Sequence, residues 1–137
     1  MTRHTVGVLD TNAVVLLGSF EPDLLPAEPM ITALTLAELS AGPLATDDPG
    51  ERAARQVRLQ EVEASFDPLP FDASAARAFA LVAADLRSTG RRIRPRAFDA
   101  LIAATAIANE LPLYTCNARE FAGITGLEVV NLPHPHR

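Results

Sequence analysis

The amino-acid sequence predicts an α/β fold, a three-layer α/β/α sandwich with a short central parallel sheet. Short apolar runs of strand length alternate with longer stretches of helical periodicity, which is typical of parallel strands joined by helical crossovers. The chain has 137 residues, of which 48% are hydrophobic, enough for one compact domain. We expect this domain over residues 1–132, followed by a tail over 133–137 that lacks a folding pattern and is expected to be disordered.

The expected elements follow from these runs in chain order. Strands are predicted at Val6–Leu9, 30–32, around 68–71, Leu113–Thr115 and 129–132. Helices are predicted at 12–17, 34–40, 51–66, 74–88 and 97–110, and the last two are rich in alanine, which favours helix and close packing on a sheet. Turn-forming glycine and proline residues punctuate the elements, and segment 42–50 is expected to be the most mobile loop.

Composition excludes several classes of protein. The formal net charge is -5, so any bound polyanion needs a local basic patch. All twelve basic residues are arginine, which excludes a P-loop lysine and a Schiff-base lysine. Cys116 is the single cysteine, so neither an internal disulfide nor a cysteine-rich zinc site can form. No apolar run approaches the roughly 18 residues that span a bilayer, and no signal segment precedes the first strand. We therefore expect a cytoplasmic protein that does not associate with a membrane.

Four acidic residues stand near the predicted ends of strands. Asp10 follows the first strand, Glu38 lies in the helix after the second, Asp99 opens an alanine-rich helix, and Glu120 follows the fourth strand. The carboxyl ends of parallel strands meet at one edge of the sheet, where ligands bind in such folds. Gathered carboxylates repel one another and lose hydration, so a fold that collects them neutralises them with protons or a divalent cation. Hard oxygen ligands favour Mg²⁺, with Mn²⁺ possible.

Each acid, taken singly, also has a structural explanation. Asp10 can cap a helix, Asp99 can interact with a helix dipole, and Glu38 and Glu120 can face solvent.

The ordered set of these acids and their neighbours is more specific than any single member. It resembles the PIN-domain ribonucleases, and most closely the compact VapC-type toxins of bacterial toxin–antitoxin pairs. The resemblance extends from Val8 to about Asn131 and rests on Asp10-Thr11-Asn12, segment 35–39, Asp99 with segment 100–104, and Thr115-x-Asn117-x-x-Glu120-Phe121.

The resemblance implies a metal-dependent endoribonuclease that hydrolyses RNA, with a transfer-RNA or ribosomal-RNA loop as its expected target. It also implies a cognate antitoxin partner and a homodimer. Carried over by position, Asp10, Glu38 and Asp99 are the metal-binding and catalytic acids. The family more often has aspartate directly before the phenylalanine or at the position of Asn117, whereas this chain has Glu120 and a neutral Asn117. A site with one ion and a site with two therefore both remain open.

The surrounding residues supply hydrogen bonds and positive charge. A divalent ion lowers the pKa of water and stabilises charge on the phosphate, so no protein nucleophile is needed. Neighbouring polar side chains are expected to hold the carboxylates or contact phosphate: Thr11, Asn12, Thr115 and Asn117. The densest basic segment precedes Asp99, and its arginines are expected to bind RNA phosphates: Arg92, Arg94 and Arg96, next to Arg91.

Alternative functions follow from the same residues. A catalytically silent PIN-like domain that binds RNA or serves as a scaffold is consistent with the altered fourth position. A phosphatase of the haloacid dehalogenase type is excluded, because it needs a second aspartate at position 12, which is Asn12, and a lysine. His134 and His136 have the spacing of a chelate but lie in the proline-flanked tail, so we do not assign them as ligands. Cys116 is interpreted as an ordinary buried thiol.

Overall fold

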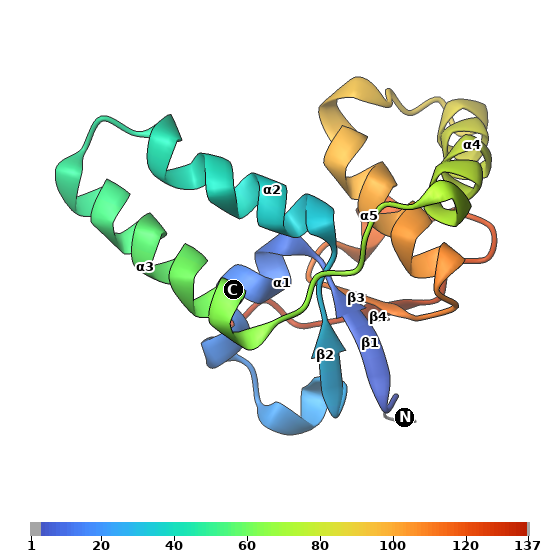
Figure 1. Ribbon diagram of the computed structural model, residues 1–137. Coiled ribbons are helices and arrows are strands. Elements are labelled where there is room, and N and C mark those ends of the chain that lie inside the picture. Colours follow the sequence, from blue (N-terminus) through green and yellow to red (C-terminus); the bar gives the residue numbers. More distant parts are fainter. Residues whose placement is uncertain (1–3, 137) are drawn as a thin grey trace.

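The fold is a four-stranded parallel sheet covered by helices on both faces, as the computed structural model describes it for residues 4–136 (Figure 1). Arg137 and residues 1–3, which belong to the predicted tail and N-terminus, lie outside the described residues. The strand order is β2-β1-β3-β4, with β1 at Val6–Leu9, β2 at Glu28–Met30, β3 at Leu113–Thr115 and β4 at Val129–Asn131. The predicted α/β/α fold class is confirmed.

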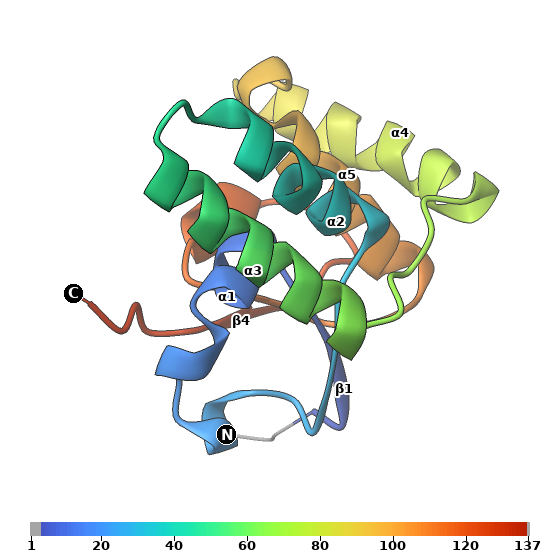
Figure 2. The ribbon, with the colours of Figure 1, turned by 60° about the vertical axis from the view of Figure 1, so that its left-hand side comes forward.

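Successive residues of the central strands enter two separate hydrophobic cores, because side chains alternate across a sheet. Val8 and Leu113 pack with α4 (Ala73–Ser88) and α5 (Ala97–Ala108). Leu9 and Tyr114 pack on the other face with α1 (Thr11–Val15) and α3 (Pro49–Ser65). Figures 1 and 2 show α4 and α5 together on one side and α1 with α3 on the other.

Side-chain caps set where helices begin. The Thr32 hydroxyl accepts the N–H of Thr35 at the start of α2 (Ala33–Ala41), the Asp48 carboxylate accepts from Glu51 in α3, and Asp72 accepts from Ala75 in α4. Helix α3 therefore starts two residues before the predicted position 51. Strand β2 ends at Met30 rather than at position 32, because Thr32 already caps the following helix. Within residues 4–136, no helix combines the length and the apolar character needed to cross a lipid bilayer.

The strand predicted around 68–71 is wrong. In this segment only Leu69 forms a β-bridge, an isolated parallel one to Thr32. The Leu69 N–H donates to Ile31 O at 2.9 Å, and Leu69 O accepts from Ala33 N at 2.8 Å. Pro68 and Pro70 have no backbone N–H, so they cannot extend this bridge into a ladder.

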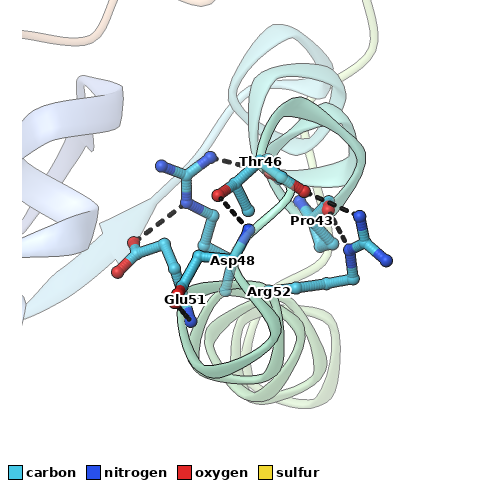
Figure 3. Close-up of polar contacts among 7 residues, drawn as sticks. Pro43, Thr46, Asp48, Glu51 and Arg52 are labelled. Atoms are coloured by element: carbon cyan, nitrogen blue, oxygen red, sulfur yellow. Dashed lines mark hydrogen bonds and ion pairs between the residues drawn. The ribbon is translucent and has the colours of Figure 1, made fainter.

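Segment 42–50, predicted to be a mobile loop, contains a 3-10 helix, η3 (Gly42–Ala45), and the first two residues of α3. Arg52 holds the segment by donating to the carbonyl oxygens of Pro43 and Thr46 at 3.1 and 2.7 Å (Figure 3). Arg55 donates to Gly42 O at 2.9 Å and pairs with Glu51. Four further 3-10 helices connect the main elements: η1 (Leu17–Ser19), η2 (Pro22–Leu24), η4 (Arg94–Arg96) and η5 (Ala118–Phe121).

The central strands pack so closely that Gly7 has no room for a side chain. A Cβ atom at Gly7 would lie 2.5 Å from Cε1 of the buried Tyr114 ring. We expect Gly7→Ala to lower the free energy of unfolding by about 1–3 kcal/mol, because the ring must shift within a filled core. Chemical denaturation measures the change. The control is Gly18→Ala, since no atom lies within 4 Å of that Cβ position; equal losses in both variants would contradict the steric explanation.

Candidate active site at the carboxyl edge of the sheet

Asp10 is the buried centre of the site, with only 4% of its surface exposed. It directly follows β1, and its Oδ1 accepts the backbone N–H of Ala13 at 2.9 Å, which caps α1. Its Oδ2 accepts the hydroxyl of Thr115, the last residue of β3, at 2.5 Å. The Thr115 Oγ1 in turn accepts the N–H of Asn117 at 2.9 Å. The capping interpretation of Asp10 is therefore confirmed, and the same carboxylate stands at the sheet edge, while its role as a metal-binding acid stays a prediction.

Glu38, in α2, is connected to the residue after Asp10 by hydrogen bonds that involve two threonines. The Thr11 hydroxyl donates to Glu38 Oε1 at 2.6 Å. Thr35 Oγ1 lies 3.0 Å from Thr11 Oγ1, and because the single Thr11 proton goes to Glu38, Thr35 is the donor in this contact. Thr35 is not among the residues predicted to hold a carboxylate. Its spacing of three residues before Glu38 places the two on one helix face, and this signal could have identified it.

The electrostatics show that three of the predicted acids lie near one another. Burial raises the pKa of Asp10, against the hydrogen bonds from Thr115 and Ala13, and the charges of Asp99 and Glu38 raise it further. Burial also raises the pKa of Glu38, opposed by the Thr11 hydrogen bond and assisted by the charge of Asp99. The chain thus brings together carboxylates from the end of β1, from α2 and from the first turn of α5.

Asp99 differs from the other two acids in having a neighbouring cation. Burial raises the pKa of Asp99, and the Arg96 guanidinium opposes this shift. Arg96 ends η4, three residues before Asp99, and also forms an ion pair with Glu120 in η5. The guanidinium therefore serves two acids at once, Asp99 by its field and Glu120 by direct contact.

Glu120 is placed at the rim of the site rather than within the group of three acids. Its carboxylate pairs with Arg96, and its turn is held by Arg91, which donates to the carbonyl oxygens of Glu120 and Arg119 at 3.1 and 3.2 Å. Of the arginines expected to bind RNA, Arg96 is engaged with acids, whereas Arg92 and Arg94 are exposed. The role of Glu120 as a fourth metal ligand stays a prediction.

The acids fit a hard divalent cation by their chemistry, although they do not form a preassembled cage. The pKa values of the three carboxyl groups are raised, which means that their ionised forms are unfavourable in the metal-free site. A bound cation would stabilise these ionised forms. Across residues 4–136, however, no three or more histidine, cysteine, aspartate or glutamate side chains are arranged to hold one ion together. Asp10, Glu38 and Asp99 would bind such an ion only after side-chain adjustment.

Two hollows flank the turn at Cys116 and Asn117. The first, of about 300 Å³, contains the predicted residues Asn12 and Asn117. The second, of about 370 Å³, contains Asn117 and Glu120. The predicted hydrogen-bonding residues are therefore divided between two tasks: Thr11 and Thr115 hold carboxylates, while the two asparagines line open space beside them.

Comparison with known proteins identifies related sequences and folds. The model of the PIN domain family matches residues 7–127. Ribonuclease VapC5 of Mycobacterium tuberculosis is 36% identical over 134 residues, covering 96% of this chain and 96% of that protein. A crystal structure of VapBC-5 from that organism, a member of the VapBC family of toxin–antitoxin systems, has a TM-score of 0.81 at 33% identity, covering 93% of this chain and 99% of that one. VapBC2 from Rickettsia felis, solved with a DNA fragment from its promoter, has a TM-score of 0.72 at 23% identity, covering 92% and 98%, a likeness of fold alone.

The raised pKa values predict how stability depends on pH. A carboxyl whose pKa is higher in the folded state stabilises the fold below its unfolded pKa, and this contribution is lost as pH rises through the folded pKa. The metal-free protein should therefore lose stability as pH rises from about 4 toward neutrality. We expect Asp99→Asn, which removes one of the mutually repelling charges, to unfold at higher denaturant than the wild type at pH 7, with the difference shrinking toward pH 4.

Urea unfolding in chelator at a series of pH values measures this difference. The control is Asp47→Asn, which removes an exposed carboxylate from the loop before α3 and should leave the pH dependence unchanged. An Asp99→Asn variant less stable than the wild type at pH 7 would contradict the electrostatic interpretation.

Proposed function

Because the chain belongs to the PIN-domain family, and within it to the VapC group, we propose that it is an endoribonuclease toxin neutralised by a cognate antitoxin. The observation that carries the proposal is the group of Asp10, Glu38 and Asp99 at the carboxyl edge of β1 and β3. Three elements supply these acids, and the hydroxyls of Thr11 and Thr115 orient two of them. Such orientation of acids by neighbouring side chains is what a hydrolytic metal site requires.

We propose Mg²⁺, or Mn²⁺, as the cofactor. When bound, the ion supplies Lewis acidity toward the phosphate and lowers the pKa of water. The protein contributes position: Asp10 is immobilised by Ala13 and Thr115, so it can serve as the fixed ligand of the site. Glu38 is held by Thr11 at one oxygen, which suits it to orient the attacking water. The half-buried Asp99 completes the set from α5.

The number of ions depends on Glu120. Three acids are sufficient for one ion that keeps several waters, as Mg²⁺ usually does. A second ion would require Glu120 to leave Arg96, because that carboxylate is already paired. We therefore propose one resident ion, with a second binding only when substrate phosphate draws Arg96 away.

For the antitoxin we propose a contact surface between α1 and α3. A groove of about 450 Å³ lies there, lined by apolar side chains that include Val14, Val57 and Phe66. Val57 is 53% exposed and Val15 37% exposed, so the groove presents apolar side chains of two helices to solvent. The apolar face of a partner helix would cover them. Solved relatives come from toxin–antitoxin complexes, which supports a protein partner of this kind.

The remaining biological assignments are also proposals. We place the protein in the cytoplasm, where RNA substrates occur, and expect a homodimer, whose mass light scattering can measure. The expected substrate is a loop of transfer or ribosomal RNA, since unpaired bases can be splayed into a groove. The exposed Arg92 and Arg94 are the arginines available for its phosphates.

A catalytically silent RNA-binding or scaffold domain is the second candidate function. It is favoured by the ion pair between Arg96 and Glu120, which removes the fourth acid from the group. The two candidates differ in one measurable property, because both bind RNA but only the nuclease cuts it.

Cleavage of total cellular RNA by the purified, antitoxin-free chain tests the proposed function. We expect discrete cuts that require Mg²⁺ or Mn²⁺ and stop in chelator, and a fall of at least about 100-fold in Asp99→Asn, because that variant lacks an ionic ligand. The matched control Asp47→Asn, an exposed acid outside the site, should cut like the wild type. Intact RNA in every reaction, from folded protein that still binds it, would reject the nuclease and favour the silent domain.

Thermal unfolding gives a readout of the metal site that does not depend on catalysis. Mg²⁺ at about 100 times its dissociation constant should stabilise the wild type by roughly 2.7 kcal/mol, because only the folded state gathers the three acids. Asp99→Asn should show little of this stabilisation, and Asp47→Asn should show all of it. The same Mg²⁺-induced shift in both variants would place the ion outside the acid group.

A further inference from the structure

The hollow beside Asn12 has no part in the proposed metal chemistry and is built partly from the C-terminal tail. Its volume is about 300 Å³, and we name it the tail hollow, defined by its lining residues: Asn12, Val15, Leu16, Cys116, Asn117 and His134. After β4 the chain runs past α1, as Figure 2 shows, and this course carries His134 to the hollow. The lining combines apolar side chains with two amides and one imidazole ring.

A backbone hydrogen bond defines the chemistry of the His134 ring. The Nδ1 atom accepts the N–H of His136 at 3.2 Å. In a neutral imidazole, one nitrogen accepts and the other carries the proton, so Nε2 of His134 is the N–H donor. His134 is half-buried, whereas His136 is exposed and contributes to this bond only through its backbone. The tail thus presents one ring with a defined donor atom at the hollow.

The tail hollow adjoins the group of acids through covalent and hydrogen-bonded connections. Asn12 lies two residues after Asp10. Asn117 donates its N–H to Thr115, whose hydroxyl donates to Asp10. The tail hollow also shares Cys116 and Asn117 with the second hollow, which extends to Glu120. A ligand that crosses the acids therefore has open space on either side of the turn at 116–117.

We propose that the tail hollow binds a nucleobase of the RNA, one that neighbours the phosphate held at the acids. This inference rests on the proposed function and adds to it a base-binding site. The amide groups of Asn12 and Asn117 have donors and acceptors for a base edge, and imidazole is one of the rings on which unpaired RNA bases stack. Among residues 4–136, no arginine lines the tail hollow, so its lining suits the base rather than the phosphate. The His134 Nε2–H suits a base carbonyl oxygen.

Binding of two fluorescent octamers separates base from backbone contacts. One is octauridylate, and the other is an abasic ribose-phosphate octamer with the same backbone. Both are titrated against protein in the Asp99→Asn background, which is not expected to cut them, with Mg²⁺ present. We expect His134→Ala to weaken octauridylate binding by about tenfold, within the range that stacking on one aromatic ring supplies. Binding of the abasic octamer should not change.

The matched control is His136→Ala, which alters the neighbouring exposed histidine of the same tail but keeps the backbone N–H that binds His134. It should bind both octamers like the parent. His134→Phe keeps a ring without the Nε2–H, so it should recover part of the octauridylate affinity. Circular dichroism of each variant tests whether the fold is retained.

Three results would overturn the inference. An octauridylate affinity of His134→Ala equal to that of the parent would show that the His134 ring makes no contact with RNA. An equal loss on both octamers would show a backbone contact instead of a base site, and a parent protein that binds neither octamer would leave the hollow without an RNA ligand. Failure of the proposed function is distinct from these, because it appears as absent metal-dependent cleavage by the wild type.

Discussion

The site depends above all on the buried Asp10 carboxylate and its two donors. The Ala13 N–H donates to one carboxylate oxygen at the start of α1, and the Thr115 hydroxyl, at the end of β3, donates to the other. Because β1 and β3 are neighbours in the sheet, one short hydrogen bond joins segments 105 residues apart in the sequence. Glu38, Asp99 and the turn at Asn117 are arranged around this connection.

Gathering acids in this way costs the metal-free fold stability, since burial and mutual repulsion oppose the charged forms. The chain limits the cost with neutral donors and one cation. Thr11 and Thr115 stabilise the ionised carboxylates, while Arg96 serves Asp99 and Glu120 together. A cation bound at the acids would be an alternative partner to Arg96 for the same charges.

Much of the fold could be predicted because it follows from local patterns. The apolar run before Asp10 and the alanine-rich helix around Asp99 appear in the structure close to their predicted bounds. The errors arise where two roles compete for one residue. Thr32 was assigned to a strand but caps a helix, since its hydroxyl satisfies the Thr35 N–H. Pro68 and Pro70 leave the predicted third strand as a single bridge, because they cannot donate to a ladder.

The sequence by itself determined which residues carry charge, where helices and strands alternate, and hence that Asp10 and Thr115 stand at the carboxyl ends of parallel strands. Only the tertiary structure decided how these side chains pair: Glu120 with Arg96, Thr35 with Thr11, and His134 with the hollow beside Asn12. The physical reason is the distance along the sequence over which each kind of interaction acts. Helix periodicity and capping act over a few residues and are visible in sequence order, whereas hydrogen bonds and ion pairs between distant elements depend on ångström-scale placement that strand order and helix packing set together.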